Sequence, residues 1–337
     1  MLQSEGYGWS VTCSMKNTLL SFLGCAKCGC ESLSLHSEAA NGTEIYSGEL
    51  HCESCYATYR ISRGVPQIFD HDPVLNITSR AFSDEWRLRR AGFFEANSLF
   101  GFTIEQYLEH FRFVFQIECF TSMPSCVVVE AGCGSCEMLQ EMARQLPRAT
   151  FIGIDLSENV VAANQLTHDL PNLHFIRADI QKLPLKNDIA DYVFCSGVLH
   201  HLANPARGLS ELGRLLGAEG KLYCWVYSRN VFCIYDFVRR CLLRPYRLSC
   251  RLRVALSYFM APFIWIFQRA TKLYGYKTNG ESFPTIAFRL FDNLSPEYQF
   301  RYTRSEIDAM CASAGVSWPN FVNELGFVCV KSGKGSR

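Results

Sequence analysis

The sequence predicts an α/β fold, in which a parallel sheet flanked by helices follows a small cysteine module and is interrupted by a helical insertion. Three observations predict it. From Cys126 onward, short β-branched runs alternate with helical segments, which is typical of repeated strand–helix–strand units. The first of these runs leads into a glycine-rich turn. Two Cys-x-x-Cys pairs stand upstream of it.

Composition limits the class of protein. A chain of 337 residues with 48% hydrophobic content suits one full domain plus a smaller module, and it is too apolar to be disordered. Lys and Arg number 33 against 32 Asp and Glu, and the resulting net charge of +1 argues against a surface built to cover nucleic acid. No charged segment followed by an apolar one opens the chain, so we expect a cytoplasmic protein whose 17 cysteines are reduced.

The C-terminal half contains one long uncharged apolar run, Val254 to Gln268. It is shorter than the about 20 residues that cross a bilayer, and Pro262 stands in its middle. We therefore expect no transmembrane span.

Changes in composition predict the domain boundaries. We expect a loosely ordered leader at 1–22, a zinc-ribbon module at 23–70, a helical linker or substrate cap at 71–120, the sheet core at 121–228, a basic apolar helical insertion at 229–290, and a C-terminal helix and strand pair at 291–337. Asn204 with Pro205 predicts a helix start, and Thr303 with Glu306 predicts a capping box.

The first strand of the core runs into the segment Glu130-Ala131-Gly132-Cys133-Gly134. Glycines at such a turn let the backbone approach a ligand closely. A second strand ends in Asp155, 23 positions beyond Gly132, where an acid can accept hydrogen bonds from ribose hydroxyls. Together, the turn and the acid indicate a nucleoside site.

The charge of this turn favours a cationic nucleoside. A dinucleotide would bring its pyrophosphate against Glu130, whereas S-adenosylmethionine has no phosphate and carries an ammonium and a sulfonium group. A third acid, Asp179, closes the next strand, where it could read the adenine amine while Ile180 packs on the ring.

These residues resemble the class I S-adenosylmethionine-dependent methyltransferases of the small-molecule branch, and the likeness extends over Cys126 to Tyr227. It implies a Rossmann-like seven-stranded sheet that ends in an antiparallel strand pair within Val316 to Val330. The segment Asp191 to His201 resembles the fourth-strand motif of the family. The resemblance implies that the cofactor is held by Glu130, Gly132, Cys133, Gly134, Asp155, Leu156, Asp179, Ile180, Ser196 and Val198.

The loop after the fourth strand faces the transferred methyl group in that family. If the acceptor is a hydroxyl, His201 and then His200 are the candidates for a general base, although a histidine there can equally cap or pack. Methyl transfer is an in-line displacement, so the main task of such a protein is to hold the acceptor in a dry pocket.

The first motif departs from the family at Cys136, where the third glycine would stand. A side chain there could crowd the cofactor. Cys133 and Cys136 also form a Cys-x-x-Cys at a strand-to-helix turn, as in disulfide oxidoreductases. That alternative leaves Asp155 and Asp179 unexplained.

The upstream pairs Cys25/Cys28 and Cys52/Cys55 supply four thiolates, the ligand set of a closed, structural zinc site. Cys30 and His51 rank below them as ligands, and four unliganded buried cysteines remain the alternative. With Tyr59 and Gly64-Val65-Pro66, the module resembles the zinc ribbon of the small activator protein that partners several methyltransferases. It differs from that ribbon at Ala26 and Arg60, where proline is usual.

Residues 229–277 contain eight Arg and two Lys against one Asp, a charge of +9, and they are rich in aromatic residues. Such a segment suits an anionic membrane surface or a lipid-linked phosphate substrate. The alternative is a helical lid whose arginines are only solvated.

The leading hypothesis is a methyltransferase acting on a small or lipid-linked acceptor, at oxygen. One alternative is an RNA methyltransferase, because zinc ribbons also precede enzymes of that kind; the near-neutral charge argues against it. The other is a non-catalytic scaffold or activator, supported only by Cys136.

Overall fold

The computed structural model of the chain describes residues 14–42, 44–69, 73–94, 102–120, 123, 125–229, 244–273 and 282–331. Residues 1–13 of the expected leader, and 230–243 and 274–281 of the expected insertion, lie outside the described residues.

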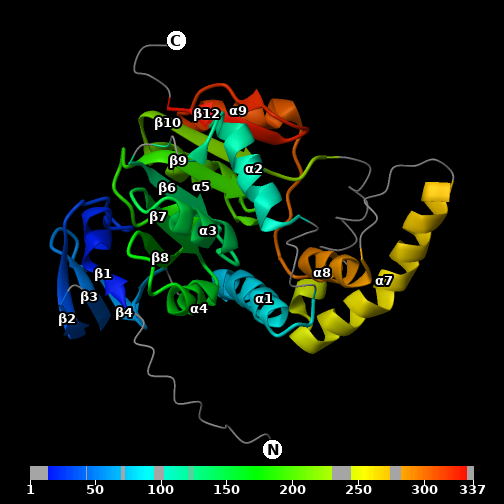
Figure 1. The fold of residues 1–337 in the computed structure, drawn as a ribbon, viewed down its shortest axis with the longest axis horizontal. Coiled ribbons are helices and arrows are strands. Elements are labelled where there is room, and N and C mark those ends of the chain that lie inside the picture. The colour runs from blue at the N-terminus through cyan, green and yellow to red at the C-terminus, as the bar shows by residue number, and fades with distance from the viewer. Residues whose placement is uncertain are drawn as a thin grey trace, which may run out of the picture.

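A seven-stranded sheet forms the core (Figure 1). Its order is β8 (Leu173–Ala178), β7 (Thr150–Asp155), β6 (Val127–Ala131), β9 (Ala190–Ser196), β10 (Leu216–Trp225), β12 (Gly326–Val330) and β11 (Asn320–Phe321). The strands β8 to β10 run parallel, and β12 and β11 are antiparallel. The predicted Rossmann-like sheet with a terminal antiparallel pair is confirmed.

Helices cover both faces of this sheet. They are α2 (Ile104–Phe115), α3 (Glu137–Gln145), α4 (Asn159–Leu166), α5 (Pro205–Arg214) and α9 (Arg304–Ala314), with the short turns η3 (Ile180–Lys182) and η4 (Leu199–His201). Strand β6 shows why both faces are covered, because Val128 packs into one hydrophobic cluster and its neighbour Val129 packs into the other. Successive strand residues point to opposite faces, so a strand that is apolar throughout must be covered on both sides.

The helix starts predicted at Asn204 and at Thr303 are present. The Asn204 side chain accepts from the backbone N–H of Arg207 at the start of α5. Thr303 and Glu306 form a capping box at the start of α9, which ends at Gly315 in the left-handed conformation.

The N-terminal module continues the central sheet. It consists of β1 (Met15–Lys16), η1 (Asn17–Ser21), β2 (Leu33–Asn41), β3 (Glu44–Cys52), β4 (Thr58–Ser62) and β5 (Val65–Ile68). Strand β5 pairs in parallel with β8, Gln67 opposite Arg177 and Ile68 opposite Ala178. The two modules therefore share one sheet, and their apolar residues share one hydrophobic cluster.

Residues 14–22 differ from the loosely ordered leader expected from the sequence. They form β1 and η1, and Met15 and Leu19 are buried. The Lys16 ammonium donates to the carbonyls of Leu170 and Leu173. Tertiary contacts order this segment, which has no periodicity of its own.

A third group of helices forms a cap beside the sheet: α1 (Pro73–Arg90), η6 (Pro245–Arg247), α7 (Cys250–Leu273) and α8 (Phe283–Leu294). Aromatic side chains of α1 and α8 pack together, with Trp86 against Phe288. Figure 1 shows α7 at the end of the molecule opposite the cysteine module, with α8 and α1 between α7 and the sheet. Helix α8 crosses the boundary expected at residue 290.

Helix α7 corrects the expectation that no segment is long enough to span a membrane. It is 24 residues long and continues through Pro262. Over Cys250–Ala270 it is long and apolar enough to cross a membrane by length and composition, and 17% of that stretch is buried. The uncharged run Val254 to Gln268 is shorter than the helix, which extends past Arg253 at one end and Arg269 at the other.

Candidate functional site

A cavity of about 1160 Å³ lies at the carboxyl ends of the parallel strands. All ten residues that the resemblance assigned to the cofactor line it: Glu130, Gly132, Cys133, Gly134, Asp155, Leu156, Asp179, Ile180, Ser196 and Val198. The carboxyl ends of neighbouring parallel strands meet at one edge, which is where this class of fold binds ligands. The volume exceeds what one small ligand needs, so a nucleoside and a second molecule can share it.

The glycine-rich turn is held between two side chains. Gly132 and Gly134 have φ values of +76° and +49°. A Cβ atom at Gly132 would lie 2.2 Å from Val198 Cγ2, and one at Gly134 would lie 2.5 Å from Trp86 Cζ2. Both glycines are therefore required by backbone conformation and by space.

The carboxylate of Asp155 is anchored by backbone groups. Its Oδ2 accepts from the N–H of Gly134 at 3.0 Å, and its Oδ1 accepts from the N–H of Ser157 at 2.8 Å. Each carboxylate oxygen can accept a further hydrogen bond, so the acid is positioned and still able to bind hydroxyl groups.

Asp179 closes β8 in a similar way. Its Oδ1 accepts from the backbone N–H of Gln181 at 2.9 Å and from the side chain of the same residue at 3.2 Å. Asp179 and Ile180 are both nearly buried and both line the cavity.

Glu130 adds an acidic group beneath the turn. Its Oε2 is buried and has no hydrogen-bond partner within the described part of the chain. Burial, and then the Asp155 carboxylate, raise the pKa of Glu130 well above its usual value. A cation in the cavity would relieve both effects, since it offers a partner to a carboxylate that has none.

Cys136 lies under the turn instead of in the cavity. Its φ is 62°, it is buried in the cluster that contains Met138 and Leu139, and it is absent from the cavity wall. Its Sγ is 3.4 Å from that of Cys133. Burial raises the pKa of both thiols, so neither is activated as a disulfide oxidoreductase requires.

The structure separates the two histidine candidates. His200 is completely buried, stacks on Tyr227 with ring centroids 3.9 Å apart, and does not line the cavity. Burial, followed by the neighbouring His201 and Arg301, holds the pKa of His200 well below its usual value. The structure therefore contradicts its expected role as a base, because the short turn η4 directs it into the interior.

His201 lines the cavity. Its Nδ1 is 2.8 Å from the carbonyl oxygen of Tyr298, to which it donates a hydrogen bond. That contact assigns the proton to Nδ1 and leaves Nε2 as the basic nitrogen.

The cap and helix α2 complete the cavity with residues that the sequence did not predict. They include Glu85 and Trp86 of α1, Tyr107 and His110 of α2, Met260 and Ile264 of α7, and Asp292 of α8. Helices α1 and α2 belong to the segment 71–120, for which a linker or substrate cap was expected. Phe82, Glu85 and Trp86 share one helical face by spacing, a signal that was available once the helix was recognised.

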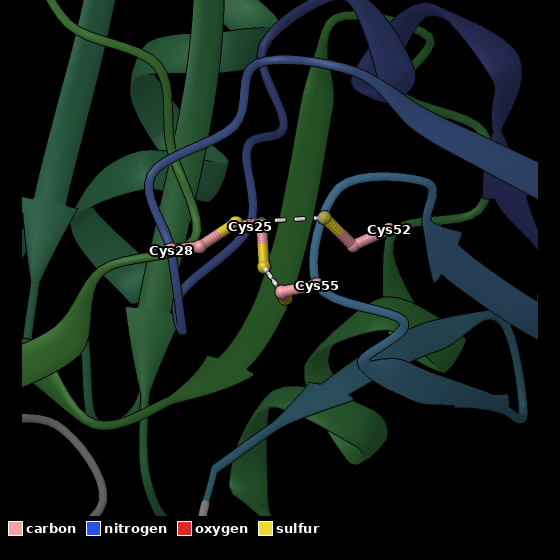
Figure 2. A group of neighbouring side chains, drawn as sticks. All are labelled: Cys25, Cys28, Cys52 and Cys55. Atoms are coloured by element: carbon pink, nitrogen blue, oxygen red, sulfur yellow. Dashed lines mark hydrogen bonds between the residues drawn. The ribbon is translucent and has the colours of Figure 1, made fainter.

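The four predicted zinc ligands form one cluster (Figure 2). The Sγ atoms of Cys25, Cys28, Cys52 and Cys55 all lie within 4.8 Å of one another, with Cys25–Cys55 at 3.5 Å and Cys28–Cys52 at 3.6 Å. Tetrahedral zinc with bonds of about 2.3 Å places its sulfur atoms about 3.8 Å apart. The cluster therefore fits a closed Cys₄ zinc site.

Neighbouring groups support this cluster. Burial opposes ionisation of Cys52, but backbone N–H groups of Cys55 and Ser54 outweigh it and lower the pKa to about 6. The Tyr59 hydroxyl lies 3.1 Å from the Cys25 Sγ. Cys30 and His51 are outside the cluster, in agreement with their lower rank.

The strand order and the placement of the turn and the acids define a class I S-adenosylmethionine-dependent methyltransferase domain. Residues 129–224 match the family described as methyltransferase domain.

Individual proteins are also similar to part of this chain. The chain is 32% identical over 95 residues to the phthiotriol/phenolphthiotriol dimycocerosates methyltransferase of Mycobacterium leprae, covering 28% of this chain and 35% of that protein. It is 33% identical over 99 residues to the trans-aconitate 2-methyltransferase of Deinococcus radiodurans, covering 29% and 37%. A solved complex of a Haloferax volcanii methyltransferase activator with a methyltransferase aligns with a TM-score of 0.40 and 16% identity over 72% of this chain and 81% of that chain.

The curated relatives match only part of the chain and part of their own length. The chain spans 31%, 25% and 35% of the length of the first three curated relatives. The family match at 129–224 covers neither the cysteine module nor helices α1, α7 and α8.

Proposed function

We propose that the protein transfers a methyl group from S-adenosylmethionine to a small-molecule or lipid-linked acceptor, at oxygen. The observation that carries the proposal is that the ten motif residues and residues of the helical cap line the same cavity. One side of this cavity has the residues for the nucleoside, and the other has the aromatic and apolar side chains that an organic acceptor needs.

The proposed cofactor contacts follow from the donor set. Asp155 would accept hydrogen bonds from the ribose hydroxyls, and Asp179 with Ile180 would hold the adenine. Glu130 and the turn at Gly132 and Gly134 would take the amino-acid end, where positive charge offsets a buried carboxylate. When bound, the cofactor supplies an electrophilic methyl group.

His201 is the proposed base. Its Nδ1 is engaged with the Tyr298 carbonyl, so the ring is oriented and Nε2 can take the proton of an acceptor hydroxyl. The ring also lies against Phe82 of the cap, with centroids 5.5 Å apart, which limits the access of water to this corner of the cavity.

Relatives support an organic acceptor. Their names specify dimycocerosates, trans-aconitate and malonyl-[acyl-carrier protein] as the molecules methylated, and the last is an O-methyltransferase. A nucleic-acid acceptor is the alternative, and methylation assays of separate lipid, small-molecule and RNA fractions distinguish the two.

Helix α7 supports a lipid-linked acceptor and a peripheral contact with a membrane. Met260, Ile264 and Gln268 line the cavity. The adjacent row, Phe259, Phe263 and Phe267, is 68%, 63% and 67% exposed. The helix has no acidic residue, and the guanidinium carbon of Arg269 lies 3.9 Å from the centroid of the Trp265 ring.

An apolar acceptor could therefore pass from an anionic membrane surface to the cavity along one helix. We propose that α7 lies on the membrane instead of crossing it, because its other face, with Arg253, Ser257 and Ala261, is buried.

The cysteine module is the proposed internal counterpart of a methyltransferase activator. A structural zinc ion held by Cys25, Cys28, Cys52 and Cys55 would order it. Because β5 pairs with β8, an ordered cysteine module would also hold in place the strand that Asp179 follows.

The experiment uses extracts of a strain that lacks the gene. Purified protein and S-adenosylmethionine with a labelled methyl group are added to separate lipid, small-molecule and RNA fractions, with the Asp155→Ala variant as control. Label in the lipid or small-molecule fraction, absent with the variant, supports the proposal. Label in RNA alone would replace it with the nucleic-acid alternative.

A further inference from the structure

Glu85 is a buried carboxylate whose role the cofactor site does not explain. It belongs to α1, it has no exposed surface, and it lines the cavity. Neither of its two oxygens has a hydrogen-bond partner within the described residues. Leaving a carboxylate buried and unpartnered costs several kcal/mol, so a group of this kind indicates a missing partner.

Neighbouring charges do not supply that partner. Arg253 of α7 pairs with Asp84 at 3.1 Å, and Arg89 forms an ion pair with Glu137. Burial and the nearby carboxylates of Asp292 and Asp155 raise the pKa of Glu85 well above its usual value, while Arg253 and Arg89 oppose the rise.

Glu85 lies on the cap side of the cavity. Its strongest charged neighbour is Asp292 of α8, which also lines the cavity, is only 7% exposed, and accepts from the Tyr227 hydroxyl at 3.3 Å. Helices α1 and α8 are outside the seven-stranded core, so this pair of acids reaches the cavity from the cap.

Glu85 is also close to the reacting corner. On the same face of α1, Phe82 packs against His201, and Trp86 lies over Gly134 of the glycine-rich turn. Residues at positions i, i+3 and i+4 of a helix are neighbours, so Glu85 lies between these two contacts.

We propose that Glu85 and Asp292 bind the polar head of the methyl acceptor, and that this head is a hydrogen-bond donor, a hydroxyl or an amine, and not a carboxylate or a phosphate. Two buried acids attract a donor and repel an anion. Two arginines line the same cavity: Arg289 is exposed, and the half-buried Arg301 lies over the ring of Tyr227 and donates to the carbonyl of Ser228. The apolar part of the acceptor then lies along Met260 and Ile264.

This inference rests on the proposed function and assigns its acceptor class. The probes are octylamine, octanol and octanoate, which share one tail and differ only in the head. Each is titrated calorimetrically into the full-length protein saturated with S-adenosylhomocysteine. We expect octylamine and octanol to bind and octanoate to bind at least about tenfold more weakly.

The variants are Glu85→Gln and Asp292→Asn, with Glu141→Gln on the exposed side of α3 as control. We expect each of the first two to reduce octylamine affinity by about tenfold, while the control does not. Thermal melting checks that each variant folds, and Glu85→Gln keeps the shape of the side chain.

Equal binding of the three probes, or unchanged octylamine affinity in Glu85→Gln, would overturn the inference. A loss of S-adenosylhomocysteine affinity in Glu85→Gln would also overturn it, because the acid would then serve the cofactor. If the unmodified protein binds no S-adenosylhomocysteine, the proposed function itself fails, and that result is separate from the others.

Discussion

The carboxylate of Asp155 accepts a hydrogen bond from the backbone N–H of Gly134, 3.0 Å away. The acid at the end of β7 and the turn at the end of β6 are thereby fixed relative to each other before any ligand binds. Because such preorganisation lowers the entropy cost of binding, the pair is the natural centre of the nucleoside site.

Asp155→Ala should weaken S-adenosylhomocysteine binding by about 100-fold, since it removes both the ribose contacts and the anchor of the turn. Titration calorimetry measures the affinity of each variant for S-adenosylhomocysteine. Asp191→Ala is the matched control: Asp191 also accepts from a backbone N–H, that of Val127 at 2.8 Å, but at the amino end of the sheet. Retained affinity in Asp155→Ala would contradict the cofactor assignment.

His201→Ala should leave cofactor affinity intact and slow methyl transfer by about 10²- to 10⁴-fold, because the proposed base is lost. His201→Asn keeps a donor for the Tyr298 carbonyl and should be equally slow, so loss of the hydrogen bond cannot account for the effect. The rate is measured as label transferred to the responsive extract fraction. A fast His201→Asn enzyme would exclude the proposed base.

Purified protein should contain one zinc ion per chain, measured by elemental analysis. Cys28→Ser and Cys52→Ser should each lose it and melt at a lower temperature, because the ion closes the module. Cys30→Ser, just outside the cluster, should keep the metal. Full zinc content in Cys52→Ser would argue against the four-cysteine site.

Replacing Phe259, Phe263 and Phe267 by serine should reduce co-sedimentation with vesicles of phosphatidylcholine and phosphatidylglycerol, without lowering the melting temperature, because these side chains are mostly exposed. Trp318→Ser, at a residue that is 75% exposed on the core, is the control. Unchanged sedimentation of the triple variant would remove the membrane contact.

His174 should make the protein sensitive to acid. Burial, and then Lys16, lower its pKa from 6.5 to about 4. The unfolded chain therefore takes up a proton below about pH 6.5 that the folded chain refuses, so stability is lost as the pH falls from 6.5 towards 4, by up to roughly 3 kcal/mol. His174→Gln should lose less stability between pH 7.5 and 4.5, measured by urea unfolding. Parallel curves for the two proteins would contradict this.

The cofactor side of the cavity could be predicted because its residues follow strand ends. Gly132, Asp155 and Asp179 each stand at the carboxyl end of a strand, and parallel strands bring such positions to one edge whatever surrounds them. The four zinc ligands could also be predicted from the sequence, since their chemistry depends on paired spacing within a short segment.

The acceptor side could not be predicted in this way. Glu85 and Asp292 are far apart in the chain, and only the packing of α1 against α8 brings both into the cavity. His200 and His201 are adjacent in sequence, yet the short turn η4 sends one into the interior and the other into the cavity. The pairing of β5 with β8, which joins the two modules, could not be predicted from the sequence either.

Local motifs along the sequence thus determined the class of domain, the nucleoside contacts and the metal ligands, because these depend on residue type at fixed short spacing. Only the tertiary structure decided which histidine and which acids of the cap line the cavity. Those depend on how helices from distant parts of the chain bury their apolar faces, and burial alone gives a carboxylate such as Glu85 its need for a partner.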